Sequence, residues 1–298
     1  MDIRFILVAL ALASPALSIT LPQRAQAQVQ APAQAQAKPA EAGQSAAIKA
    51  FSKALMIGDV LDVMRAEGIA NSIELSDSLF PGENAAAWAA VVSMIYDTGK
   101  MHSRFDAALA VAVGNDSETL KAAQVFFASD LGQQIMTLEI AARRTLLNKA
   151  AEATAKESWA GLVAEKAARA DHIIRFGGAN DLIESNVMGA LNANLAFYRG
   201  LSGARGFGDA MSEDQMLAEV WGQELDIRRD TTEWLYPFLS LAYKPLTDAE
   251  LDRYTAFSET DAGQKINAAI FVAFDAVMGA ISADLGQAAG RLMAGQDI

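Results

Sequence analysis

From Ala46 onward, apolar residues recur every three or four positions, as they do on one face of an α-helix. Few segments show the strict alternation of apolar and polar residues that is typical of a half-buried strand. We therefore predict an all-α fold, a multi-helix bundle whose helices bury their apolar faces against one another. The predicted helices cover roughly residues 46–66, 68–78, 84–98, 101–113, 117–128, 131–175, 180–200, 212–243, 247–258 and 262–293.

Residues that favour turns separate these predicted helices. Phe80-Pro81-Gly82 predicts a turn, and Gly177-Gly178 predicts the end of the long helix over 131–175. The glycine-rich stretch from Gly200 to Gly208 predicts a loop. Pro237 falls inside a predicted helix, where we expect a kink or a break because proline lacks an N–H group. Residues suited to N-caps, each followed by acidic residues, are Ser117, Ser212 and Thr247.

A segment in the first half of the chain resembles one in the second half. ETLKAAQVFFASDLGQQIM starts at Glu118, and AELDRYTAFSETDAGQKIN starts at Ala249. A constant offset between otherwise different segments is typical of an internal repeat. We therefore predict two related helical repeats, over 46–168 and 169–298, which form either two domains or one fused domain. The identical pairs, each 131 residues apart, are Leu120 and Leu251, Phe126 and Phe257, Asp130 and Asp261, Gly132 and Gly263, Gln133 and Gln264, and Ile135 and Ile266.

The repeated positions suit a sharp corner between a short helix and a long one. The aromatic ring can fill the angle between the two helices. The hydroxyl and carboxyl side chains can accept hydrogen bonds from the free N–H groups that start the second helix. The glycine lacks a Cβ and lets another backbone approach closely. We predict a structural role for these positions, which are Phe126, Ser129, Asp130, Gly132 and Gln133 in the first repeat and Phe257, Thr260, Asp261, Gly263 and Gln264 in the second.

This pattern resembles the DUF2059 family, which comprises exported bacterial proteins of unknown function. The family pattern is an LTxxEL helix, an aromatic residue, a small residue and S/T-x-x-G-Q/K before a long apolar helix. Leu246 to Leu251 reads LTDAEL, whereas the first repeat has only SETL from Ser117. Asp130 and Asp261 stand where the family often has proline. The resemblance covers about 35 residues in each half; it implies a helical periplasmic protein and brings no catalytic residues.

Residues 1–27 have the features of a secretory signal peptide. The apolar run over 5–17 follows one basic residue and is shorter than the roughly 20 residues that a transmembrane helix needs. We predict cleavage after Ala27, with cleavage after Ser18 or an uncleaved anchor as the alternatives. Residues 28–45 are rich in Ala, Gln and Pro, which predicts a flexible tether. The expected location is the periplasm.

Composition narrows the possible partners. The net charge of −12 and pI near 4.7 indicate that the clustered basic surface needed for nucleic acid is absent, so we predict no nucleic-acid partner. The lack of cysteine excludes disulfides, thiolate nucleophiles and cysteine-ligated metals. The apolar stretch from Ile266 to Leu285 contains Asn267, Asp275 and Asp284, which are costly in a bilayer. We predict a buried helix there and no membrane span after signal cleavage.

No constellation of residues indicates catalysis, so we predict no catalytic residue, metal or cofactor. The two histidines, His102 and His172, are predicted to be ordinary helix residues. His102 and Asp106 could share a metal, but two ligands do not complete a site. The loop from Gly203 to Gly208 lacks the spacing of a phosphate-binding loop. Arg143-Arg144 is expected to face solvent rather than a partner.

These features predict an exported helical protein that binds or interacts with other molecules in the cell envelope. Its partner would be another protein, an envelope component or an apolar ligand held between the two repeats. One alternative is a hydrolase-like helical enzyme that uses carboxylates with His102 or His172. Another is a chaperone-like envelope factor, which would expose apolar surface. The candidates for a binding groove, although core packing is favoured for them, are Trp88, Trp159, Trp221 and Trp234.

Overall fold

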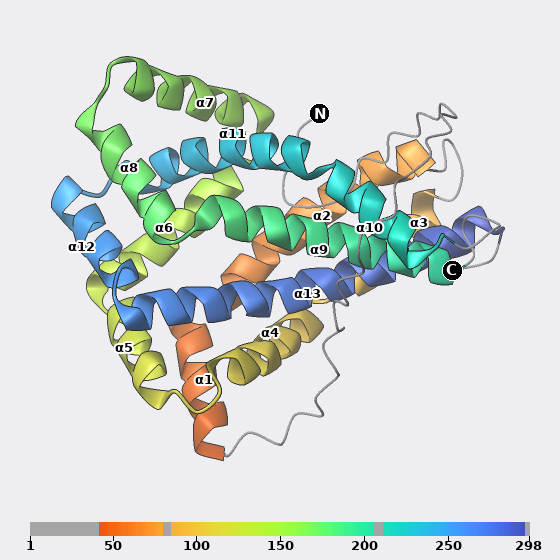
Figure 1. The fold of residues 1–298 in the computed structure, drawn as a ribbon, viewed down its shortest axis with the longest axis horizontal. Coiled ribbons are helices and arrows are strands. Elements are labelled where there is room, and N and C mark those ends of the chain that lie inside the picture. Colours follow the sequence, from red (N-terminus) through yellow and green to blue (C-terminus); the bar gives the residue numbers. More distant parts are fainter. Residues whose placement is uncertain (1–41, 80–84, 205–210, 296–298) are drawn as a thin grey trace, which may run out of the picture.

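A computed structural model describes residues 42–79, 85–204 and 211–295 (Figure 1). These residues form helices joined by short turns, and no strand occurs among them, which confirms the predicted all-α bundle. The predicted signal peptide, most of the predicted tether and the turn Phe80-Pro81-Gly82 lie outside the described residues. The helices are α1 (Ala42–Ala54), α2 (Ile57–Leu79), α3 (Ala85–Ile95), α4 (Thr98–Val113), α5 (Ser117–Phe127), α6 (Asp130–Thr145), α7 (Lys149–Ala164), α8 (Ala168–Ala179), α9 (Leu182–Gly203), α10 (Glu213–Gly222), α11 (Glu224–Tyr243), α12 (Asp248–Ser258) and α13 (Asp261–Met293).

The prediction of a single long helix over 131–175 is wrong, because the chain forms α6, α7 and α8 there. Between α6 and α7, the Asn148 side chain accepts hydrogen bonds from the N–H groups of Ala150 and Ala151 and so starts a new helix. Between α7 and α8, Lys166 has a φ of +51°, a left-handed conformation that ends a helix. Neither turn contains glycine or proline, so the usual sequence signals of a break are missing.

Several other predicted boundaries also differ. α1 begins at Ala42, inside the predicted tether, and the turn before α2 falls at Met56, which has a φ of +51°. The predicted helix over 212–243 is divided at Gln223 into α10 and α11. α11 continues through Pro237, so the break expected there does not occur.

The helix end predicted at Gly177-Gly178 is confirmed to within one residue, because α8 ends at Ala179. The loop predicted from Gly200 is corrected in part. Gly200 belongs to α9, which ends at Gly203, and residues 205–208 of the predicted loop lie outside the described residues. Gly200 lies at a close helix crossing rather than in a turn, because a Cβ there would be 2.2 Å from the Ala283 carbonyl oxygen.

Predicted N-caps are confirmed at two of three sites. Ser212 and Thr247 cap α10 and α12, each in a reciprocal arrangement with the side chain three residues on. The cap of α5 is Asp116 rather than Ser117, because the Asp116 carboxylate accepts a hydrogen bond from the N–H of Thr119. The cap therefore precedes the predicted residue by one position.

The long helix α13 packs chiefly against α9 and then α4, and Figure 1 shows α9 and α13 side by side. Their backbones meet at glycines. A Cβ added at Gly200 would lie 2.2 Å from the Ala283 carbonyl oxygen, and one added at Gly286 would lie 2.1 Å from that of Phe197. By length and composition alone α13 could cross a membrane, but such a helix can equally be the core of a soluble protein, and 39% of its most apolar window is buried in this fold.

The corner between α5 and α6 is held by residues of the repeated motif. Ser129 caps α6, because its Oγ accepts a hydrogen bond from the Gly132 N–H at 3.1 Å. The same hydroxyl donates to the Phe126 carbonyl at 2.6 Å. Gln133 donates to the carbonyl of Ala54 at 2.7 Å. Since Ala54 is the last residue of α1, Gln133 ties the corner to the end of that helix.

The corner between α12 and α13 contains the same set of contacts. The Thr260 hydroxyl accepts a hydrogen bond from the Gly263 N–H at 3.0 Å and donates to the Phe257 carbonyl at 2.7 Å. Gln264 donates to the carbonyl of Ala179 at 2.6 Å. Ala179 is the last residue of α8, so this glutamine joins its corner to a helix end in the same way.

The two corners also touch each other. The rings of Phe126 and Phe257 stack with their centroids 4.1 Å apart and their planes 5° from parallel. The predicted need for glycine is clear at both sites. A Cβ at Gly132 would lie 2.3 Å from the Phe126 carbonyl oxygen, and a Cβ at Gly263 would lie 2.1 Å from that of Phe257. Side chains larger than hydrogen cannot fit either corner without backbone movement.

Candidate ligand-binding cavity

A cavity of about 280 Å³ lies between the two halves of the chain. Its walls come from α2, α5 and α6 in the first half and from α8, α9, α11, α12 and α13 in the second. Because both halves contribute, the cavity depends on how they pack together. Its position also places it next to the two corners, since Phe127 at the end of α5 and Phe257 and Gly263 at the second corner are among the lining residues.

Large aromatic side chains form much of the cavity wall. Side chains of this kind usually bury most of their surface in a protein core. Here five of them remain only half-buried. The rings of two, Trp234 and Phe238, stack on each other with centroids 4.9 Å apart, which makes a flat apolar surface. The five half-buried side chains are Trp234, Phe238, Phe257, Phe271 and Phe274.

Glu139 of α6 is a polar group in this apolar wall. It lies on the same face of α6 as Met136, Ile140 and Arg143, which also line the cavity. Its Oε1 accepts a hydrogen bond of 2.7 Å from the hydroxyl of Tyr243 at the end of α11. Within the described part of the chain no other group hydrogen-bonds this carboxyl, so Oε2 is open to a molecule in the cavity.

The surroundings of Glu139 change its acidity. Desolvation raises the pKa of Glu139 to about 7, and the hydrogen bond from Tyr243 opposes this with a smaller lowering. Part of the side chain remains accessible, but the residue lines the cavity, so that part faces the cavity. Burial also raises the pKa of Tyr243 and Tyr254 well above the usual range, and the charge of Glu139 adds to both. Glu139 can therefore be protonated or ionised near neutral pH.

Two other charged residues line the cavity. Arg143, expected to face solvent, instead donates two hydrogen bonds to the buried Glu67 of α2, at 2.8 and 2.6 Å. Asp275 of α13 accepts a hydrogen bond from Asn192 of α9 at 3.3 Å. Burial raises the pKa of Asp275, and the Asn192 amide partly offsets this. The arginine charge is thus balanced within the wall, whereas the two cavity carboxyls have neutral partners.

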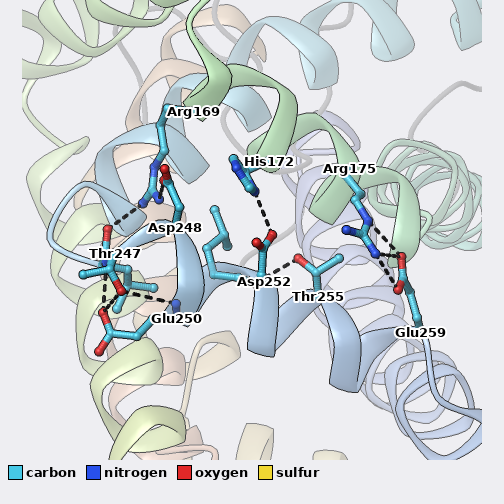
Figure 2. Close-up of polar contacts among 11 residues, drawn as sticks. Arg169, His172, Arg175, Thr247, Asp248, Glu250, Asp252, Thr255 and Glu259 are labelled. Atoms are coloured by element: carbon cyan, nitrogen blue, oxygen red, sulfur yellow. Dashed lines mark hydrogen bonds and ion pairs between the residues drawn. The ribbon is translucent and has the colours of Figure 1, made fainter.

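Two ion pairs and the hydrogen bond of His172 with Asp252 join α8 to α12 beside the end of α11 that carries Tyr243. Figure 2 shows basic side chains of α8 directed at acidic side chains on α12 and at its C-terminal end. Arg169 also donates to the carbonyl oxygens of Tyr243 and Leu246 at the end of α11. These bonds hold the Tyr243 backbone while its hydroxyl reaches Glu139. The three pairs are Arg169–Asp248 at 2.6 Å, His172–Asp252 at 2.7 Å and Arg175–Glu259 at 2.9 Å.

The predicted motif residues belong mainly to the corners and not to the cavity. Phe257 and Gly263 line the cavity as well as holding a corner. Asp130 and Asp261 are exposed and form the first residues of α6 and α13, so the caps are the hydroxyl residues before them. The motif positions that do not line the cavity are Phe126, Ser129, Asp130, Gly132, Gln133, Thr260, Asp261 and Gln264.

Neither histidine reaches the cavity. His102 lies 3.7 Å from Asp106, one turn along α4, and His172 pairs with Asp252 on α12. Among the residues that the structure describes, no cluster of three or more histidine, aspartate or glutamate side chains is arranged to hold a metal ion. The histidines are therefore not positioned to act together with Glu139.

Sequence reasoning missed Glu139 and Tyr243 as site residues. A signal for Glu139 does exist, because it interrupts the apolar stripe that Met136 and Ile140 form on α6. No comparable signal marks Tyr243, whose partner is 104 residues away in the chain. Trp234 does line the cavity, as one of the four tryptophans proposed for a groove.

Comparison with known proteins adds no further assignment. No family model matches the chain, and neither curated proteins nor solved structures show a match to it.

Proposed function

We propose that this chain is an exported, non-enzymatic binding protein of the cell envelope, which holds an apolar molecule in the cavity between its two halves. The cavity is the observation that carries this proposal, because its wall leaves five aromatic side chains half-buried. Removing apolar surface from water lowers the free energy by roughly 25 cal/mol per Å². A ligand that covers these rings gains that energy, and concave apolar sites with a few polar groups are typical ligand sites.

The proposed location rests on the sequence. The features of residues 1–27 are those of a secretory signal peptide, and the repeated motif resembles a family of exported proteins. A chain without cysteine is also compatible with an oxidising compartment. The periplasm is the compartment that agrees with all three features.

We further propose that the two halves are copies of one helical unit. Helices α1 and α2, with 13 and 23 residues, match α8 and α9, with 12 and 22. The turns that join them contain Met56 and Asp181, with φ values of +51° and +49°. The equivalent residues Phe126 and Phe257 stack on each other, as expected for residues close to a two-fold axis. On this proposal the cavity is an interface between copies.

A cavity-filling substitution tests the proposed function. Val60 lines the cavity, so Val60→Trp should occupy part of its volume. Val111 of α4 is 66% exposed, and Val111→Trp adds the same side chain outside the cavity. The fluorescent, uncharged probe N-phenylnaphthylamine should bind the purified wild-type chain. Its affinity should fall about tenfold in Val60→Trp, a loss of about 1.4 kcal/mol, and stay unchanged in Val111→Trp.

Circular dichroism of both variants shows whether the helical fold is intact. Equal probe affinity in wild type and a folded Val60→Trp variant would contradict binding in the cavity. Many weak probe sites in all three proteins would instead support the chaperone-like alternative, because that function needs exposed apolar surface. Turnover of a substrate by the purified chain would contradict a non-enzymatic role.

A further inference from the structure

The two proposed copies contribute different polar groups to the cavity. At the 131-residue offset of the repeated motif, Glu139 corresponds to Ile270, and both side chains line the cavity. At the same offset Tyr243 corresponds to Ala112. The Glu139–Tyr243 pair therefore has no counterpart in the other copy. At these two equivalent positions one side of the cavity offers a carboxyl group, whereas the other offers an aliphatic side chain.

The charges that line the cavity favour a cation over an anion. The guanidinium of Arg143 is already bound by both carboxylate oxygens of Glu67. Glu139 and Asp275 have uncharged hydrogen-bond partners, a phenol and an amide. In the described part of the chain, the charge left over in the cavity wall is therefore negative.

We propose that the ligand is a lipophilic amine, whose protonated amino group donates to the Glu139 carboxylate while its apolar chain lies against the half-buried aromatic rings. This inference rests on the proposed function and names the ligand class of the same cavity. An ammonium group supplies the donor that Glu139 Oε2 lacks, and a charge-assisted hydrogen bond is stronger than a neutral one.

Other head groups fit this wall less well. A fatty carboxylate would place its charge beside two carboxyls, while the guanidinium of Arg143 in the wall is already paired with Glu67. A plain hydrocarbon would leave Glu139 Oε2 enclosed without a donor, which is unfavourable. An alcohol would donate one neutral hydrogen bond and bind more weakly than the amine.

The acidity of Glu139 agrees with this assignment. Its pKa is raised to about 7 in the empty cavity, chiefly by desolvation. A neighbouring ammonium group lowers the pKa of a carboxyl, so arrival of the amine should release the Glu139 proton to solvent. The groups beside this carboxyl are the phenols of Tyr243 and Tyr254 and the paired Arg143.

Three ligands with one apolar chain separate the head-group effect from apolar binding. Octylamine, octanol and octanoate are titrated calorimetrically into the purified chain at about pH 8, where Glu139 is ionised. Octylamine should bind about tenfold more tightly than octanol, and octanoate most weakly. In Glu139→Gln, which keeps an acceptor for Tyr243, this tenfold margin should vanish while octanol affinity is retained. Glu157→Gln, on the exposed surface of α7, should keep the margin.

The outcomes distinguish the ligand class from the proposed function. Equal binding of amine and alcohol, tightest binding of octanoate, or a margin that survives in Glu139→Gln would overturn the amine assignment and leave apolar binding in place. Failure of all three compounds to bind the folded wild-type chain would overturn both. Retained octanol affinity shows that the Glu139→Gln variant has folded with its cavity intact.

Discussion

Replacing Glu139 with glutamine isolates the contribution of one enclosed carboxyl to the stability of the fold. Desolvation raises the pKa of Glu139 from 4.5 to about 7, against the smaller effect of the Tyr243 hydrogen bond. The folded protein thus holds this proton more tightly than the unfolded chain does. The stabilisation is fully present below about pH 4.5 and is lost as the pH rises through 7. The difference between the folded and unfolded pKa values corresponds to about 3 kcal/mol of unfolding free energy.

Urea denaturation of wild type and Glu139→Gln at about pH 5 and about pH 8 measures this effect. From pH 5 to pH 8 the wild type should lose about 2 kcal/mol of unfolding free energy relative to Glu139→Gln. This is less than the full effect, because part of the wild-type loss occurs below pH 5. All other titrating groups, both histidines included, are common to the two proteins and cancel in the comparison. If the stabilities of the two proteins change in parallel over this range, the carboxyl is not enclosed as the structure shows. Glu157→Gln, whose carboxyl is exposed, should run parallel to wild type.

Two further predictions concern packing. Gly132→Ala and Gly263→Ala should each lower the unfolding free energy by more than about 2 kcal/mol, because a Cβ would lie 2.3 or 2.1 Å from a carbonyl oxygen. A Cβ at Gly161 would meet no atom within 4 Å, so Gly161→Ala should raise the unfolding free energy by about 0.5–1 kcal/mol. Equal effects of the three glycine substitutions in urea denaturation would refute the corner geometry. Arg143→Ala should cost about 3 kcal/mol because it leaves the buried Glu67 without its guanidinium partner. Thermal or urea unfolding of the double variant with Glu67→Gln should recover much of that loss, and no recovery would contradict the pairing.

Local features of the fold follow from the sequence because they depend on residues close together in the chain. Ser212 and Thr247 start helices because their side chains accept hydrogen bonds from N–H groups three residues on. The residues around them in the sequence predict this directly. The same holds for Ser129 and its hydrogen bond to the Gly132 N–H. Repetition of this corner 131 residues later was also visible, since short motifs keep their spacing.

Helix ends without glycine or proline were not predictable in the same way. The turns at Asn148 and Lys166 interrupt a continuous helical pattern, and apolar spacing alone predicts one helix across them. Pro237 shows the opposite case, because a residue that usually breaks helices lies inside α11. Apolar spacing and the usual effect of proline therefore do not by themselves fix where these helices end.

The sequence by itself therefore determined the helical class and the chemistry of the two corners, which depend on composition or on neighbours along the chain, and it is the basis of the proposed export. Only the tertiary structure decided that Glu139 and Tyr243, 104 residues apart, share a hydrogen bond at the wall of a cavity. It also decided that Arg143 faces Glu67 rather than solvent. The physical reason is that a cavity, and the pKa of a group within it, depend on which helix faces pack against each other. That packing cannot be predicted from a single sequence.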